Sequence, residues 1–483
     1  MFKVNNFELD QVPYADIVED CSAIIVGKKA SATGEVLFGH NEDDRGNNVM
    51  VQYRVPRKKH NPGEYLTFEP ECAKIPQVPV TWGYIWSETR ASWKAPFSDT
   101  FINEWGVAIA SDSCSNSRED MPELTNGGIG YGLGHIVAQR ARTAREGVEI
   151  AAGLLDKYGY TASGRAYQIV DNNEGWVLQV VKGKHYVAKR VPDDEVMFIP
   201  NWYTIRNVDL SDKNNYIASD DLITYAIDRG WYKPSVPSDF SDFDFAIAYQ
   251  DPNQKQDGNI YRHKNALRMI LGKEPEDVRV FSVSPKEKLG VEDVKKILRT
   301  HYEGKDDDLS NGYSVNPHKT GIRTICTSTT IESIVVQFRE KPELTCVWRA
   351  LLNPCTSPYV PWYLGIDKIP TGFGWISPET GLANHFNVPL ADLSYRPGRA
   401  WWAFQDVQDL ADESYAEFIG RISESRDALE EMWRKSQNEF EARVSATLSD
   451  DPAKAIRMLT TYTDKQARLA WTTWRKLFQD LLS

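Results

Sequence analysis

The chain has 483 residues and is acidic, with a formal net charge of −12 at pH 7. Hydrophobic residues make up 41% and charged residues 26%, a composition typical of globular proteins. Nucleic-acid binding needs a basic surface, and a membrane span needs about 20 apolar residues in a row. The sequence has neither feature, so we expect no nucleic-acid partner and no membrane span.

The first 20 residues are acidic and do not resemble a secretory signal. They contain Lys3 and five carboxylate residues, and they lack the basic start and apolar centre of a signal peptide. We therefore interpret residues 1–20 as a leader or propeptide and expect a cytoplasmic protein.

Six cysteines are spread along the chain without a CxxC pair or a spacing typical of metal ligands. They are Cys21, Cys72, Cys114, Cys326, Cys346 and Cys355. In a reducing compartment we expect five of them to be small buried hydrophobic residues, with no metal and no cofactor bound. Cys21 differs from the others because it directly precedes an apolar segment.

The segment after Cys21 predicts a β-hairpin. Residues 22–26 form a short apolar run rich in β-branched residues, residues 27–34 are typical of a turn, and residues 35–39 predict the returning strand. The polar cluster HNEDD, residues 40–44, follows directly. The hairpin would therefore bring this cluster back beside Cys21.

Further along, residues 106–113 predict a strand and residues 131–158 predict a helix in two pieces. Thr143 and Glu146 have the spacing of a capping box, and Gly159 is a suitable residue to end the helix. Both signals favour a helix that begins after Thr143.

The rest of the chain predicts more strands and then long helices. Strand patterns occur at residues 165–171, 176–181, 185–191, 324–338 and 346–352. Residues 205–320 are more polar, with a helix expected over residues 264–271. Residues 401–444 and 454–482 are amphipathic and predict helices. This order of elements predicts a layered α+β fold.

Cys21 would gain a second function if the peptide bond before it were cleaved. Its new α-amine would have a pKa near 7.7–8.0, well placed to act as a base at neutral pH. One residue would then supply both the nucleophile and the base. The alternatives are a buried structural cysteine and a solvated loop at residues 40–44.

The opening segment CSAIIVGKKASATGEVLFGHNEDD resembles the start of the C69 dipeptidases, N-terminal-nucleophile (Ntn) amidohydrolases related to penicillin V acylase and bile salt hydrolase. Further blocks resemble the family in the same order: NEWGVAIASDS, ARTAREGVEIAAGLLDKYG, VPDDEVMFIPNWYTI, FDFAIAYQD, SPYVPWYLGI and RAWWAFQDVQDLA. The resemblance implies an αββα four-layer Ntn sandwich over residues 21–400. A helical extension, residues 401–483, is expected to pack on this core or on a partner subunit.

The resemblance also implies roles for single residues. Cys21 is the expected nucleophile, and Asp43 matches the carboxylate that holds the nucleophile's amine. Asn201 matches the side-chain donor to the oxyanion, and Asn103 matches a position that lines the pocket. Each of these three polar residues also has a structural alternative, in a turn or at the start of a strand.

Two positions depart from the family pattern. His40 stands where relatives usually carry arginine, which makes the charge beside the nucleophile sensitive to pH. Relatives often carry an arginine close to Thr329, for which Arg323 is the nearest candidate. Six residues of strand would place Arg323 about 20 Å away. Trp202 is a further candidate for substrate binding.

The resemblance implies hydrolysis of dipeptides or similar small amides through a thioester, after removal of residues 1–20. Glu42 and Asp44 are candidates to meet a substrate ammonium group. The alternatives are an acylase acting on N-acyl amino acids and a non-catalytic binding protein of the same fold. A metal-dependent hydrolase using residues 40–44 is the least favoured, because contiguous residues rarely converge on one ion. A homo-oligomer is compatible with the long C-terminal helices.

Overall fold

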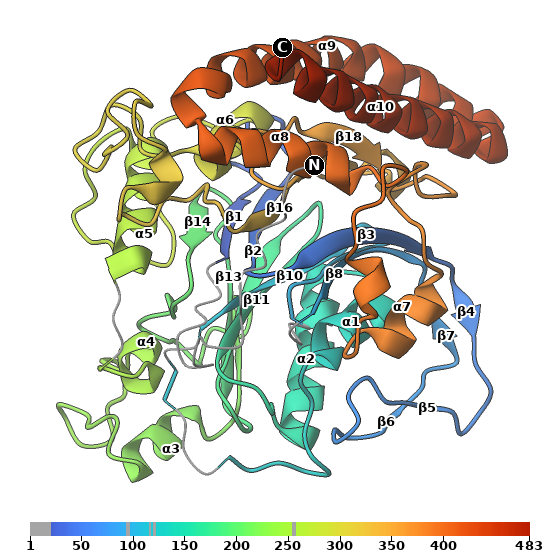
Figure 1. Cartoon of the computed structure of the whole chain (residues 1–483). Helices are drawn as coiled ribbons and strands as arrows, with labels where there is room; N and C mark the ends of the chain where they lie inside the picture. The colour runs from blue at the N-terminus through green and yellow to red at the C-terminus, as the bar shows by residue number, and fades with distance from the viewer. Residues whose placement is uncertain (1–20, 93–96, 115–116, 119–121, 254–256) are drawn as a thin grey trace.

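The computed structural model describes residues 21–92, 97–114, 117–118, 122–253 and 257–483. The expected leader, residues 1–20, lies outside this described part of the chain. In the described part, two antiparallel sheets face one another and helices cover their outer faces (Figure 1). This is the predicted αββα four-layer arrangement.

The first sheet contains the segment that follows Cys21. Among the described residues it has six strands in the order β14-β1-β2-β16-β17-β18. They are β1 (Ser22–Val26), β2 (Leu37–Asp43), β14 (Val196–Ile199), β16 (Thr330–Gln337), β17 (Cys346–Leu351) and β18 (Val360–Tyr363). The predicted hairpin is confirmed as β1 and β2, with Ala23 opposite His40.

Strands β1 and β2, which both lie inside this sheet, are buried on both faces. Every residue of β1 and β2 is buried, so the usual alternation of polar and apolar residues is absent. Gly39 faces helix α6 (Val291–Arg299), where an added Cβ would lie 2.7 Å from Val294 Cγ1. The glycine therefore lets α6 pack directly on β2. The opposite face of β2 carries His40 toward the second sheet.

The second sheet, with eight described strands, has the order β15-β13-β12-β11-β10-β9-β8-β3. Its strands are β3 (Asn48–Val55), β8 (Tyr84–Ala91), β9 (Thr100–Asn103), β10 (Ala108–Ser113), β11 (Arg165–Val170), β12 (Gly175–Val180), β13 (Tyr186–Arg190) and β15 (Tyr216–Ala218). The strands predicted at residues 106–113, 165–171, 176–181 and 185–191 are confirmed here. Helices α1 (Gly132–Arg140) and α2 (Ala144–Tyr158) pack on its outer face.

The predicted start and end of α2 are both confirmed. The Thr143 side chain accepts a hydrogen bond from the backbone N–H of Glu146, and Gly159 ends the helix at a φ of 76°. The Glu146 carboxylate, however, accepts from the N–H of Arg142 and not from Thr143. Both ends of the helix therefore follow local sequence signals.

Shorter elements surround the two sheets. The strands are β4 (Lys58–Lys59), β5 (Tyr65–Leu66), β6 (Ile75–Pro76) and β7 (Val80–Thr81). The helices are α3 (Leu222–Asp228), α4 (Phe245–Tyr249), α5 (Asp257–Leu271), α7 (Pro378–Asn384) and the 3₁₀ turns η3 (Pro317–Lys319), η4 (Pro342–Leu344) and η5 (Leu390–Asp392). The helix predicted at residues 264–271 forms the second half of α5, which packs on β14.

The chain ends in three helices, α8 (Trp401–Glu413), α9 (Tyr415–Asp450) and α10 (Pro452–Leu481). The single helix expected over residues 401–444 is interrupted at Ser414. Helices α9 and α10 run side by side (Figure 1), and α10 also contacts α8 and the edge strand β18. No helix within the described ranges is both long and apolar enough to cross a membrane.

Candidate active site

Cys21 directly precedes β1 and is only 2% exposed. Its Sγ donates to Glu42 Oε1 at 3.0 Å and lies 3.8 Å from the backbone carbonyl oxygen of Asp43. Both acceptors belong to β2, because the hairpin pairs the start of β1 with the end of β2. The polar segment 40–44 therefore lies beside Cys21, as the sequence predicted.

The surroundings of Cys21 keep its thiol protonated. Burial raises the pKa of the thiol well above its usual value, and the nearby carboxylates of Glu42, Asp112 and Asp43 raise it further. Burial also raises the pKa of Glu42 well above that of an ordinary carboxyl group. The thiol therefore needs a base to become a nucleophile, and Glu42 is a stronger base than an exposed glutamate.

His40 connects the first sheet to the second. Its Nε2 lies 3.1 Å from Asp112 Oδ1 on β10, and its Nδ1 lies 4.0 Å from Glu42 Oε2. Asp112 in turn accepts a hydrogen bond from Gln168 Nε2 at 2.7 Å. Cys21, His40 and Asp112 each have a donor or acceptor atom within 4.8 Å of the others. The structure thus places His40 beside Cys21.

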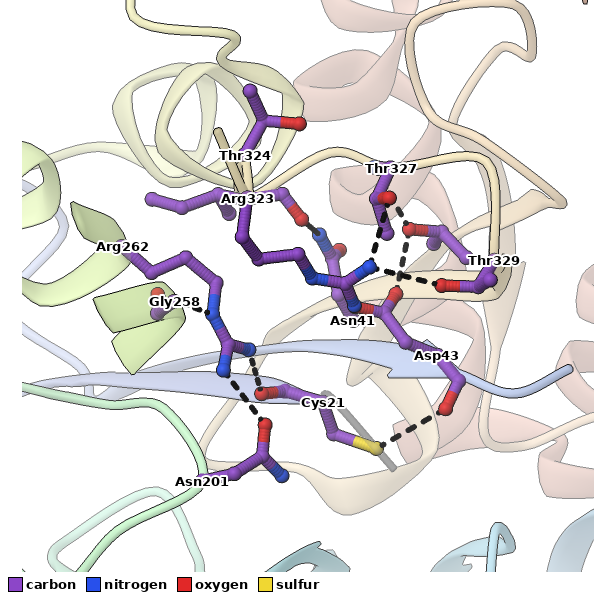
Figure 2. A network of polar contacts seen from close by, with 12 residues as sticks. Cys21, Asn41, Asp43, Asn201, Gly258, Arg262, Arg323, Thr324, Thr327 and Thr329 are labelled. Carbon is purple, nitrogen blue, oxygen red and sulfur yellow. Dashed lines mark hydrogen bonds and ion pairs between the residues drawn. The ribbon is translucent and has the colours of Figure 1, made fainter. Parts of the chain in front are cut away.

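Arg262, on helix α5, links Cys21 to Asn201 (Figure 2). Its Nη1 donates to the backbone oxygen of Cys21 at 2.7 Å, and its Nη2 donates to Asn201 Oδ1 at 2.9 Å. Among the described residues, Asn201 Nδ2 is buried and has no hydrogen-bond partner. Because Arg262 occupies the oxygen of the amide, the nitrogen remains available as a donor beside Cys21.

Asp43 is held in place by groups from the loop before β16 and from the first residue of β16. Its Oδ2 lies 2.9 Å from Arg323 Nη2, and its Oδ1 accepts from Thr330 Oγ1 at 2.6 Å. The Asp43 side chain is 1% exposed and that of Arg323 is 17% exposed. This ion pair is therefore largely shielded from water, and it fixes the position of the carboxylate.

The estimate that placed Arg323 about 20 Å from Thr329 was wrong. Residues 324–338 were expected to form one strand, but β16 begins only at Thr330 and residues 323–329 form a loop. The loop turns back, so that Arg323 Nη1 lies 3.0 Å from Thr327 Oγ1 and 3.3 Å from Thr329 Oγ1 (Figure 2). Arg323 therefore does supply a positive charge near Thr329.

Asn103 uses its side chain to hold backbone groups. Its Nδ2 donates to the carbonyl oxygens of Ala138 and Ala141, and its Oδ1 accepts from the N–H groups of Trp105 and Val107. These contacts tie the β9–β10 turn to the end of α1. They fit the structural alternative for Asn103, rather than a position that lines the substrate pocket.

Trp202 is also part of the packed interior. It is 1% exposed, its ring meets that of His263 edge-on at 5.7 Å, and Arg279 lies over it at 5.6 Å. These contacts belong to the core around α5. They give no support to the expected contact with substrate.

Sequence reasoning did not identify Arg262, Asp112 or Thr330. Arg262 is separated from Cys21 by 241 positions, so no local pattern connects the two. One signal was present: Arg262 lies on the buried face of α5 with Ala266 and Ile270. A charge at such a helical position needs a buried partner.

Comparison with known proteins identifies the family of this chain. The model for the family described as "Peptidase family C69" matches residues 20–427. A probable dipeptidase from Latilactobacillus sakei is 26% identical over 443 residues, which cover 83% of this chain and 90% of the relative. A probable dipeptidase from Salmonella dublin is 27% identical over 377 residues, covering 73% and 84%.

Among solved structures, a mutant conjugated bile acid hydrolase from Clostridium perfringens is 10% identical with a TM-score of 0.29. The match covers 68% of this chain and 89% of the hydrolase, but a similarity this low carries no argument about the site. The family match covers most of the chain and includes the residues around Cys21. The chain therefore belongs to peptidase family C69.

Proposed function

We propose that this protein is a dipeptidase with Cys21 as an N-terminal nucleophile, formed when the chain is cleaved before Cys21. Membership of a peptidase family supports amide hydrolysis, and relatives named as probable dipeptidases support the substrate class. The observation that carries the proposal is the contact of Arg262 with both Cys21 and Asn201. This contact leaves an amide donor directed to the site where a substrate oxyanion would form.

Removal of residues 1–20 would begin with the Cys21 thiol. Sγ attacks the carbonyl carbon of Asp20 while the thiol proton passes to Glu42, which accepts it at 3.0 Å. The C–N bond between the two residues then breaks, and the nitrogen takes the proton from Glu42. Water hydrolyses the resulting thioester, releasing the leader with a new carboxylate. Cys21 retains its thiol and gains a free α-amine.

The mature residue would then cleave its substrate in two steps. The α-amine takes the thiol proton as Sγ adds to the peptide carbonyl, and Asn201 Nδ2 donates to the oxyanion. The C–N bond breaks as the ammonium group protonates the leaving nitrogen. Water next adds to the thioester carbonyl and gives a proton to the amine. The C–S bond breaks and Sγ recovers that proton.

Asp43 would support this chemistry through its charge, and His40 by holding a neighbouring carboxylate. A carboxylate near the α-amine stabilises the protonated form that the leaving step requires. The ion pair with Arg323 keeps Asp43 in one position and balances its charge. His40 Nε2 lies 3.1 Å from Asp112 Oδ1 and so holds in place one of the three carboxylates that raise the pKa of the thiol.

The test is the intact mass of the purified protein, with Cys21→Ala compared to Cys346→Ala. Cys346 is an equally buried cysteine on β17, so its variant controls for loss of a buried sulfur atom. We expect wild type and Cys346→Ala to lack residues 1–20 and Cys21→Ala to retain them. We also expect the first two proteins to hydrolyse dipeptides.

Two results would contradict the proposal. A wild-type protein that hydrolyses dipeptides with residues 1–20 still attached has no free amine at Cys21, which rules out the N-terminal mechanism. A processed protein that cleaves N-acyl amino acids and no dipeptide is an acylase. Loss of the leader from Cys21→Ala would overturn only the proposed self-cleavage. The role of Cys21 in hydrolysis would then be tested separately by the activity assay.

A further inference from the structure

Two histidines and two cysteines meet at a buried point away from Cys21. This histidine–cysteine cluster consists of His301, His318, Cys326 and Cys355. One potential ligand atom of each residue lies within 4.8 Å of those of the others. The cysteines and His301 are at most 2% exposed, and the side chain of His318 is 0% exposed. Substrates cannot reach such a site, so the cluster has no use as a second catalytic centre.

The cluster is assembled from four separate segments of the chain. His301 follows α6 and His318 lies in η3, while Cys326 precedes β16 and Cys355 follows β17. Because 8 to 29 positions separate neighbours in the sequence, no short motif is present. This spacing explains why the sequence predicted no metal ligands.

The distances in the cluster suit a tetrahedral ion. His301 Nε2 lies 3.0 Å from His318 Nε2, which lies 3.7 Å from Cys355 Sγ and 3.9 Å from Cys326 Sγ. Zinc bound tetrahedrally to two nitrogens and two sulfurs places its ligands about 3.4 Å (N to N) to about 3.8 Å (S to S) apart. The observed separations differ from these values by a few tenths of an ångström.

The outer nitrogens of both histidines face carboxylates. His301 Nδ1 lies 3.2 Å from Glu303 Oε1, and His318 Nδ1 lies 3.5 Å from Asp412 Oδ1 and 3.4 Å from the amide nitrogen Nδ2 of Asn353. Metal-binding histidines commonly donate their other N–H to a carboxylate in this way. With Nδ1 protonated on each ring, two Nε2 atoms with free lone pairs would lie only 3.0 Å apart, an arrangement that a cation bound to both would stabilise.

We propose that the histidine–cysteine cluster binds one structural zinc ion. Two imidazoles and two thiolates complete a tetrahedral shell, which is typical of a structural rather than a catalytic zinc site. The set of soft sulfur and borderline nitrogen ligands disfavours magnesium and calcium, which prefer oxygen. Aromatic rings of Tyr313 and Tyr415 meet the histidines edge-on and limit access of water.

The ion would fasten the loop that holds Asp43. Cys326 lies in the same loop as Arg323, three positions further on, and its backbone N–H donates to Thr300 O at 3.2 Å. Thr330, which also binds Asp43, follows in β16. Through His318 and Asp412, the same ion would reach η3 and the end of α8. Zinc would therefore connect the C-terminal helices to the support of the active site.

The first test is the metal content of the full-length protein, purified without a metal-affinity step and measured by inductively coupled plasma mass spectrometry. We expect about one zinc per chain in wild type, and the same in a Cys346→Ser control. Cys355→Ser is expected to lower the zinc content at least tenfold. Asp412→Asn, which leaves all four ligands, is expected to weaken zinc binding about 10–100-fold.

A second measurement covers the case in which Cys355→Ser does not fold. Wild-type protein prepared with cobalt should show the absorption bands of a tetrahedral thiolate complex, and these bands should disappear on addition of zinc. Folded wild type that binds neither zinc nor cobalt would overturn the proposal. A mass 2 Da lower, with Cys326 and Cys355 resistant to alkylation, would show a disulfide and would overturn it as well. Neither measurement depends on peptidase activity.

Discussion

Arg262 offers the sharpest test of the active site, because it is expected to act through Asn201. We expect Arg262→Lys to lower kcat about 100-fold with little change in KM. Lysine keeps the charge, but a single ammonium group cannot reproduce the fork that reaches Cys21 O and Asn201 Oδ1 at 2.7 and 2.9 Å. The Asn201 amide would then lose its fixed direction.

The magnitude follows from the donor that is misplaced. Loss of one oxyanion donor typically costs 10²- to 10³-fold in kcat, or about 2.7–4 kcal/mol. Asn201→Ala removes this donor and is expected to give the full effect. If Arg262 acts by orienting Asn201, the double variant should be no more than about threefold slower than Asn201→Ala. The coupling free energy between the two residues would then be about 2–3 kcal/mol.

Loss of the two charged hydrogen bonds is also expected to lower the free energy of unfolding. At about 1.5–3 kcal/mol for each hydrogen bond, Arg262→Lys is expected to cost about 3–6 kcal/mol, to be measured by urea unfolding. The assay is steady-state hydrolysis of a dipeptide by processed protein, confirmed as folded by circular dichroism.

The matched control is Arg268→Lys on the same helix. Arg268 pairs instead with Asp307 at 2.9 Å, so kcat should stay within about twofold of wild type. Strictly multiplicative effects of Arg262→Lys and Asn201→Ala on kcat would refute the proposed coupling. An unchanged kcat in Asn201→Ala would remove Asn201 from the oxyanion site altogether.

Three further predictions test other parts of the structure. Arg323→Met leaves Asp43 buried without its ion pair with Arg323. We therefore expect kcat to fall at least tenfold and the free energy of unfolding to fall by about 3–5 kcal/mol. An unchanged kcat would exclude a role for Arg323 in positioning Asp43. Asn103→Ala is expected to lower the free energy of unfolding by about 2–4 kcal/mol, because its hydrogen bonds to backbone groups are lost. KM for dipeptides should stay the same, and a raised KM would instead indicate that Asn103 lines the substrate pocket. Burial raises the pKa of Asp99 to about 6, so the folded protein binds this proton more tightly than the unfolded chain. The contribution of Asp99 to the free energy of unfolding is complete below about pH 4, and about 2–3 kcal/mol of it is lost as the pH rises through about 6. The free energy measured by urea unfolding should therefore differ less between about pH 4 and about pH 7 for Asp99→Asn than for wild type.

Local signals were sufficient for much of the architecture. The β1–β2 hairpin follows from an apolar run, a turn and a second apolar run, which are features of neighbouring residues. The limits of α2 follow from Thr143 and Gly159, because caps act over three or four positions. The main local error was the loop 323–329, which has strand-forming composition but turns back to bind Asp43. Tertiary contacts outweighed β propensity there.

The amino-acid sequence by itself determined the layered fold class, the position of Cys21 beside the 40–44 segment and the likeness to a peptidase family, because these depend on contiguous patterns. Only the tertiary structure decided which distant groups serve Cys21. Arg262 reaches it across 241 positions, and Asp112 reaches His40 across 72 positions from the opposite sheet. The histidine–cysteine cluster also depends on contacts between residues that are distant in the sequence. Its four residues come together only because strand order and loop paths place them around one point, and sequence spacing does not record that proximity.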